Sequence, residues 1–201
     1  MALIQIDITS FQTFSSAVLA RAEAGLGYDV DGSYGYQCWD LAAELWMNIP
    51  EFSFGLYPKT GLNPDYQEVY RMWTETRAIN QGMSFDLVWR YEDIKAGDVI
   101  VLNASWYFPT TGHVCYAYQD YDPNAEEPEK LLCLGQNQDI EHSSPTVGYK
   151  PTVNLLPVRD MFLGAFRYKE WETAPPVRAV KRKPFPWYLV ARRLQMMRYG
   201  L

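Results

Sequence analysis

The chain has 201 residues, of which 48% are hydrophobic and 15% aromatic, and its formal net charge is −6 at pH 7. This length is enough for one domain with a hydrophobic core, and the composition excludes an intrinsically disordered chain. No run approaches the about 20 apolar residues of a transmembrane helix, and the first residues lack the basic segment of a secretory signal. We therefore expect a globular protein with no transmembrane segment and no nucleic-acid partner.

The first predicted element is a helix over residues 10–25. Ser10 is a typical N-cap residue and Gly25 a typical residue at which a helix stops. One apolar face is formed by Phe11, Phe14, Val18 and Leu19.

A loop rich in Asp and Gly follows and leads into a second predicted helix. Residues 38–47 carry apolar side chains at helical spacing, so we expect this helix to begin at Cys38 and to end near Met47. A thiol in the first turn of a helix meets unpaired main-chain N–H groups and the positive end of the helix dipole. Both favour the thiolate, which is the nucleophilic form of cysteine.

The second half of the chain predicts an antiparallel sheet. A less regular segment comes first, with a short helix expected over residues 64–76. Aromatic and β-branched runs then predict strands near residues 98–102, 113–120, 130–137 and 162–168. The predicted fold class is therefore α+β, with N-terminal helices packed on an antiparallel sheet and the site where the Cys38 helix meets that sheet.

A cysteine nucleophile needs a base, and the chain contains two histidines. His113 begins a predicted strand, whereas His142 lies in a polar loop, so His113 is the candidate. Alternation along the strand near 130–137 would place Asn137 on the same face as Gly135, where it could orient a neighbouring imidazole.

The order of these motifs resembles the CHAP domain of the papain-like, NlpC/P60-related superfamily. The motifs are Gln-Cys-x-Asp opening a helix, Ala-Gly-Asp-Val before a strand, Gly-His-Val in the next strand and Gln-Asn ending another, over roughly residues 10–170. CHAP domains are mostly peptidoglycan amidases or endopeptidases of bacteriophage lysins and tail-associated hydrolases. The resemblance therefore implies a papain-like CHAP fold and a cysteine-dependent hydrolase of the bacterial cell wall.

The resemblance also implies roles for the candidate residues. These roles are nucleophile for Cys38, general base and acid for His113, and third member for Asn137 with Asp139 as the alternative. Position alone makes Gln37 and the main-chain N–H of Cys38 the candidate oxyanion donors.

One position departs from the family pattern. Several phage CHAP domains carry Glu-Gln-Asn where this chain has Gly135-Gln136-Asn137, so the carboxylate is missing. An amide orients a histidine but stabilises its imidazolium less than a carboxylate does. The rival interpretation is therefore a catalytically weak or inactive CHAP-fold structural protein of a phage tail, and a third is an intracellular amide hydrolase.

The loop before Cys38 resembles the calcium loop of a subset of CHAP lysins. The implied ligands are Asp29, Asp31, Ser33, Gly35 and Asp40, and calcium prefers six to eight oxygen ligands. Three carboxylates would raise the pKa of a nearby thiol, and a bound Ca²⁺ would cancel that effect. The alternative is a turn held by side-chain hydrogen bonds, with Asp40 an ordinary acid in a first helical turn.

The charge pattern divides the chain in two. No acid follows Glu172, whereas the last residues carry seven Lys and Arg side chains. We expect a catalytic domain over 1–172 and a basic, partly amphipathic tail over 173–201. We expect the tail to dock on a phage tail or other virion protein, with membrane-surface binding and a solvated tail as alternatives. The expected location is the virion, or the host cytoplasm before lysis.

Overall fold

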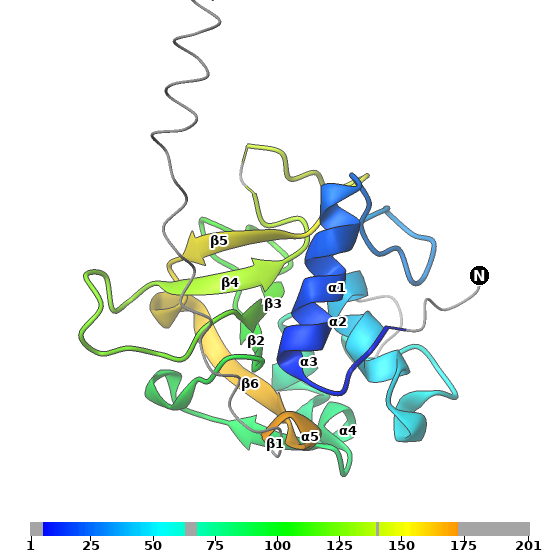
Figure 1. Cartoon of the computed structure of the whole chain (residues 1–201), viewed down its shortest axis with the longest axis horizontal. Coiled ribbons are helices and arrows are strands. Elements are labelled where there is room, and N and C mark those ends of the chain that lie inside the picture. Colours follow the sequence, from blue (N-terminus) through cyan, green and yellow to red (C-terminus); the bar gives the residue numbers. More distant parts are fainter. Residues whose placement is uncertain (1–5, 63–67, 140, 173–201) are drawn as a thin grey trace, which may run out of the picture.

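The computed structural model describes residues 6–62, 68–139 and 141–172 (Figure 1). The helices are α1 (Phe11–Glu23), α2 (Cys38–Met47), α3 (Arg71–Thr74), α4 (Arg77–Gln81) and α5 (Lys169–Glu172). The strands are β1 (Phe85–Val88), β2 (Val99–Leu102), β3 (His113–Ala117), β4 (Leu131–Gly135), β5 (Thr152–Leu156) and β6 (Phe162–Tyr168). The expected tail, 173–201, lies outside the described residues.

The strands form one six-stranded sheet in the order β1-β6-β2-β3-β4-β5, and each neighbouring pair is antiparallel. The predicted α+β class is therefore confirmed. The two edge strands, β1 and β5, were not predicted from the sequence. An edge strand pairs on one side only and needs a less complete apolar pattern than a central strand, and β5 is only partly buried along most of its length.

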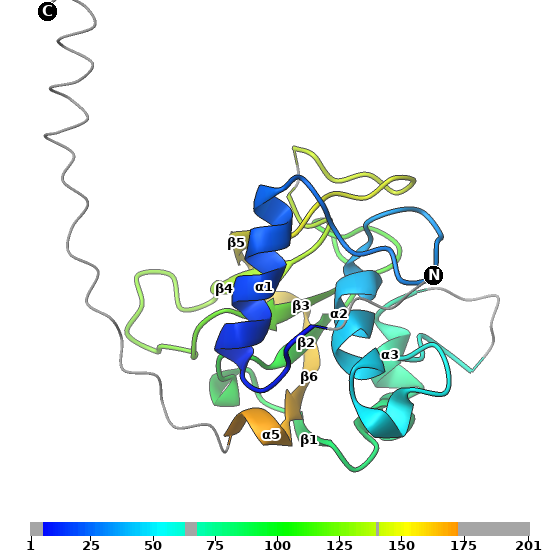
Figure 2. The ribbon, with the colours of Figure 1, turned by 45° about the vertical axis from the view of Figure 1, so that its right-hand side comes forward.

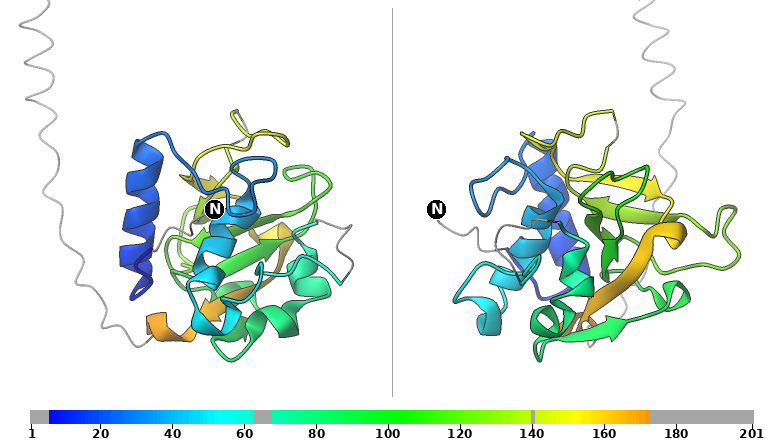
Figure 3. Two further views of the ribbon diagram at one scale, coloured as in Figure 1. Left: turned by 90° about the vertical axis from the view of Figure 1, so that its right-hand side faces the viewer. Right: turned by 180° about the vertical axis from the view of Figure 1, so that it is seen from behind.

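The main core lies between the sheet and the two long helices. Figures 1 and 2 show α1 and α2 on the same face of the sheet, and Figure 3, seen from behind, shows the strands in front of α1. Trp46 of α2 stacks on Phe85 of β1 at 4.3 Å between ring centroids, and Phe14 of α1 lies 5.0 Å from the ring of Tyr116 in β3. The first half of α2 is held against the middle of the sheet by the hydroxyl of Tyr116 in β3, which donates to the carbonyl of Leu41 at 3.1 Å.

Local sequence signals set the two long helices. Ser10 caps α1, because its hydroxyl accepts the N–H of Thr13 at 3.1 Å. The chain leaves α1 through Gly25, whose φ of +79° favours glycine. In α2 the carboxylate of Asp40 accepts the N–H of Gln37 at 3.0 Å, so the helix begins at Cys38 as predicted.

Three predicted bounds need correction. The helix expected over 64–76 is α3 at Arg71–Thr74, and residues 63–67 lie outside the described chain. The strand expected over 113–120 ends at Ala117. The strand expected over 130–137 ends at Gly135. None of the described helices is long and apolar enough to cross a membrane.

Candidate active site

Cys38 opens on a cleft of about 840 Å³. The thiol belongs to the first residue of α2 and is partly buried. The apolar wall of the cleft is formed by Leu56, Tyr57, Leu62, Val69 and Ile79. The indole N–H of Trp39 donates to the carbonyl of Pro58 at 2.8 Å, which ties this wall to the start of α2. The cleft is large enough to hold a peptide-sized substrate against the sulfur.

The sulfur of Cys38 lies beside strand β3. The main chains of Val114 and Trp39 lower the pKa of this thiol, and Val114 directly follows His113. Burial raises the pKa of Cys38 to about 12, and the charge of Asp40 acts in the same direction. The helix N-terminus by itself favours the thiolate, as the sequence predicts. Burial outweighs that effect here, so the resting group is a neutral thiol.

His113 is the first residue of β3, and its imidazole is buried at 2% exposure. The ring stacks on Phe108 at 4.1 Å between centroids, with 10° between the planes. Its Nε2 lies 3.3 Å from Oε1 of Gln138. Burial lowers the pKa of His113 to about 4, so the ring is neutral at pH 7. Within the described residues, no hydrogen bond joins this ring to Cys38.

The structure does not bring Asn137 to His113. Asn137 follows the end of β4 and has a φ of +56°, so the alternation expected along a strand to 137 is broken there. Its amide nitrogen donates to Oε1 of Gln37 at 2.7 Å and to the carbonyl of Ser144 at 2.9 Å. The residue at the imidazole is Gln138, which sequence reasoning missed because an unbroken strand would have turned it to the other face.

The alternative third member, Asp139, is also engaged elsewhere. Its Oδ2 lies 3.0 Å from Nδ1 of His142, and the ring of His142 stacks on Tyr149 at 4.9 Å. This histidine and its partner lie in the polar segment after β4, where the sequence analysis placed His142.

Gln37 links two loops at the mouth of the cleft. Its Nε2 donates to the carbonyls of Tyr34 at 2.6 Å and Ser144 at 3.3 Å, and its Oε1 accepts from Asn137. Both amide protons of Gln37 are therefore engaged in this structure. Its role as an oxyanion donor stays a prediction, and the main-chain N–H of Cys38 is the simpler candidate for that role.

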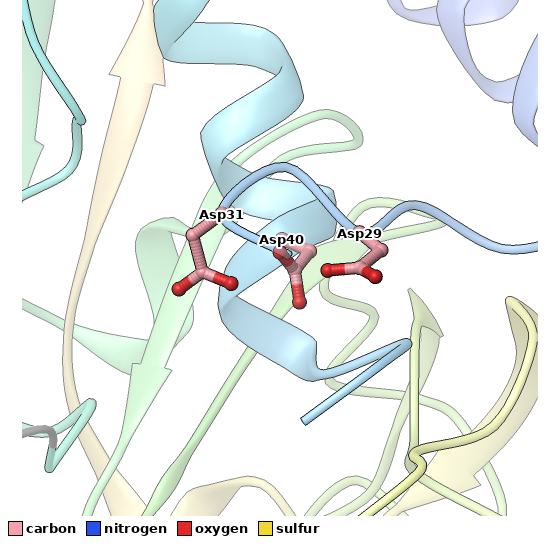
Figure 4. A group of neighbouring side chains, drawn as sticks. All are labelled: Asp29, Asp31 and Asp40. Atoms are coloured by element: carbon pink, nitrogen blue, oxygen red, sulfur yellow. The ribbon is translucent and has the colours of Figure 1, made fainter. Parts of the chain in front are cut away.

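Three carboxylates gather beside the start of α2. Figure 4 shows Asp29, Asp31 and Asp40, which each offer an oxygen within 4.8 Å of the others. Burial raises the pKa of Asp40 to about 7, and the charges of Asp31 and Asp29 add to this effect. Oδ1 of Asp29 is buried without a hydrogen-bond partner. A cluster of like charges with an unsatisfied buried oxygen fits a divalent cation.

The other two predicted ligands have turn contacts. The N–H of Ser33 donates to Oδ1 of Asp31 at 2.7 Å, and the carbonyl of Gly35 accepts the N–H of Gln37 at 3.0 Å. Gly35 has a φ of +67°, and a Cβ there would lie 2.3 Å from the carbonyl oxygen of Val147. The loop is thus built partly by the side-chain hydrogen bonds that the alternative interpretation expected.

The buried imidazole predicts an acid-sensitive fold. Below pH 6.5 the unfolded chain protonates His113, whereas the folded chain keeps it neutral down to about pH 4. The unfolded state then binds more protons, so stability falls as the pH falls through this window, by about 3 kcal/mol at its lower end. We expect urea unfolding to show that the free energy of unfolding decreases less between pH 7 and pH 4.5 in His113→Gln than in wild type.

The exposed His142 supplies the control for this measurement. The matched variant is His142→Gln, which makes the same substitution at the second histidine, outside the buried contacts of His113. If the free energy of unfolding decreases equally in wild type and in His113→Gln between the two pH values, the fold does not hold His113 neutral.

No protein-family model and no curated protein matches this chain. Among solved structures, it is similar to the endolysin LysIME-EF1, with a TM-score of 0.55 and 22% sequence identity over 95% of this chain and 86% of that one. It is also similar to Ly7917, with a TM-score of 0.54 and 18% identity over 79% of this chain and 62% of that one. These similarities show a shared fold.

Proposed function

We propose that this chain is a peptidoglycan hydrolase that cleaves an amide bond through Cys38 and His113, as CHAP domains do. The observation that carries the proposal is the thiol of Cys38 at the start of α2, which is open to the cleft and lies beside the main chain of Val114, the residue after His113. The fold shared with an endolysin supports the substrate class.

The resting protonation states suit a reaction between neutral groups. Cys38 transfers its proton to the ring nitrogen of His113 that does not face Gln138, while the sulfur attacks the amide carbon. The tetrahedral intermediate collapses to a thioester, and the imidazolium protonates the leaving amine. Water, deprotonated by the imidazole, then hydrolyses the thioester and restores the thiol. This step requires Cys38 and His113 to approach each other when substrate binds, as catalytic hydrogen bonds often do.

We further propose that the acidic cluster binds Ca²⁺. Asp29, Asp31 and Asp40 would hold the ion, with oxygens of Ser33 and Gly35 as the remaining predicted ligands. The ion supplies positive charge that opposes the three carboxylates. The buried, unpartnered oxygen of Asp29 supports this assignment over a loop held by hydrogen bonds alone.

The direct test is mass analysis of soluble fragments released from purified peptidoglycan, with calcium and with chelator. A hydrolase of this type releases fragments with a new amine and a new carboxylate at one bond type. Fragments cut only at glycosidic bonds, or no fragments in either condition, would contradict the proposal.

A second candidate is a CHAP-fold structural protein of a phage tail without turnover. Two observations favour it: the missing hydrogen bond between Cys38 and His113 among the described residues, and the absence of a side chain at Gly135. The fragment analysis separates the two candidates, because a structural protein releases nothing.

The charge division predicts separate roles for the domain and the tail. We propose that 173–201 docks the protein on a phage tail or other virion component, as its seven basic residues and lack of acids suggest. A chain ending at Glu172 should hydrolyse peptidoglycan at the full-length rate and lose co-purification with the virion. Loss of hydrolysis with unchanged virion association would contradict this division.

A further inference from the structure

Gln138 carries a buried amide whose orientation is fixed by its neighbours. The side chain is 1% exposed. Its Nε2 donates to the carbonyls of Cys133 and Thr152, each at 2.9 Å, and lies 3.3 Å from Oδ1 of Asn154. An amide nitrogen only donates, so these three acceptors hold it on the strand side and leave Oε1 facing His113.

The orientation of this amide determines the tautomer of His113. Oε1 of Gln138 lies 3.3 Å from Nε2 of the imidazole, and a carbonyl oxygen only accepts. The neutral ring must therefore carry its hydrogen on Nε2, which leaves the lone pair on Nδ1. The stacked ring of Phe108, at 4.1 Å, holds the plane of the imidazole.

Gly135 leaves the space that this amide needs. A Cβ built on Gly135 would lie 2.1 Å from Oε1 and 2.8 Å from Cδ of Gln138. A side chain at 135 and the observed position of Gln138 thus exclude each other. The neighbouring amide of Gln136 cannot serve instead, because it donates to the carbonyls of Tyr28 and Gln37 at 2.7 and 2.8 Å.

We propose that Gln138 is the positioning residue of His113: its carboxamide holds the Nε2–H tautomer and occupies the space of a side chain at 135. The consequence for catalysis rests on the proposed hydrolase function. The tautomer itself does not, because it follows from the buried contacts alone.

Nitrogen NMR of the imidazoles in the full-length chain tests the tautomer without substrate. At pH 7 we expect His113 to show a protonated Nε2 and a bare Nδ1, with its signals identified by their persistence in His142→Gln. Gln138→Met removes the acceptor at similar length and should abolish this preference. Gln136→Met, the matched loss of a neighbouring buried amide, should keep it. A protonated Nδ1 in wild type would overturn the proposal even if no variant folds.

The kinetics of peptidoglycan hydrolysis provide the second test of the proposal. Gln138→Met should lower kcat on the order of 10²-fold with little change in KM, since general acid–base catalysis contributes about 10²–10⁴-fold. Gln138→Glu keeps the acceptor and adds a negative charge that favours the imidazolium. It should stay active and move the acid limb of the pH profile to higher pH. Wild-type kcat in Gln138→Met would refute the positioning role, whereas an inactive wild type would refute the proposed function and leave the tautomer result standing.

Discussion

Cys38→Ala is expected to lower the rate of peptidoglycan hydrolysis by at least about 10⁴-fold, because the members of a nucleophilic unit act together and loss of one removes most of the catalysis. The fold should persist. Cys38 is only partly buried at the start of α2, and the cap of that helix comes from the carboxylate of Asp40 rather than from the thiol. Release of fragments from purified peptidoglycan, followed at equal protein concentration, measures the effect.

The variants around this experiment separate catalysis from packing. His113→Ala should be nearly as inactive as Cys38→Ala, and the double variant scarcely worse, since both remove the same unit. Cys133→Ala removes a buried thiol that does not line the cleft and keeps the main-chain carbonyl that accepts from Gln138, so hydrolysis per folded molecule should stay at the wild-type rate. If Cys38→Ala released fragments from peptidoglycan at the wild-type rate, another group would be the nucleophile.

The parts of the site that the sequence predicted are those set by local signals. The start of α2 at Cys38 follows from apolar spacing and from an acid three residues after the N-cap, both visible in the chain. The position of His113 at the head of a strand follows from a β-branched and aromatic run. Both features depend on residues that are close to each other in the sequence.

The partner of His113 was missed because it depends on a single backbone angle. Asn137 adopts a φ of +56° after β4 ends, and this turn delivers Gln138 instead of Asn137 to the imidazole. Asn is one of the few residues that tolerate this conformation, but its presence alone does not require it. Part of the choice was made by a contact distant in sequence, because Gln37 lies 100 residues before Asn137 and, together with the nearby Ser144, holds its amide.

The thiol pKa also depends on distant contacts. A helix N-terminus lowers the pKa of cysteine by a local effect, whereas burial of the thiol, with the charge of Asp40 acting in the same direction, raises it to about 12. The sign of the shift is therefore set mainly by packing, which the local sequence does not show. A cation held by Asp40 would remove the contribution of that charge and leave the contribution of burial.

Calcium is accordingly expected to accelerate alkylation of Cys38. With chelator, the carboxylates of Asp29, Asp31 and Asp40 oppose the thiolate, and with Ca²⁺ bound two positive charges offset them. Each unit by which the pKa of Cys38 falls raises its thiolate fraction about tenfold at a fixed pH below the midpoint. The same binding should raise the melting temperature, because the ion binds the folded cluster and not the dispersed acids of the unfolded chain.

The experiment follows alkylation rate against pH, with peptide mapping to distinguish Cys38 from the buried Cys115 and Cys133. Calcium should move the profile to lower pH, and Asp31→Asn should reduce the shift by removing one ligand charge. Asp122→Asn is the matched control. It neutralises an exposed acid far from the cluster in sequence and keeps an oxygen to accept the N–H of Asn124, so the calcium shift should be unchanged. If the profiles in calcium and in chelator are identical and calorimetric titration shows no heat of binding, the Asp cluster does not bind calcium and the loop is a turn held by hydrogen bonds.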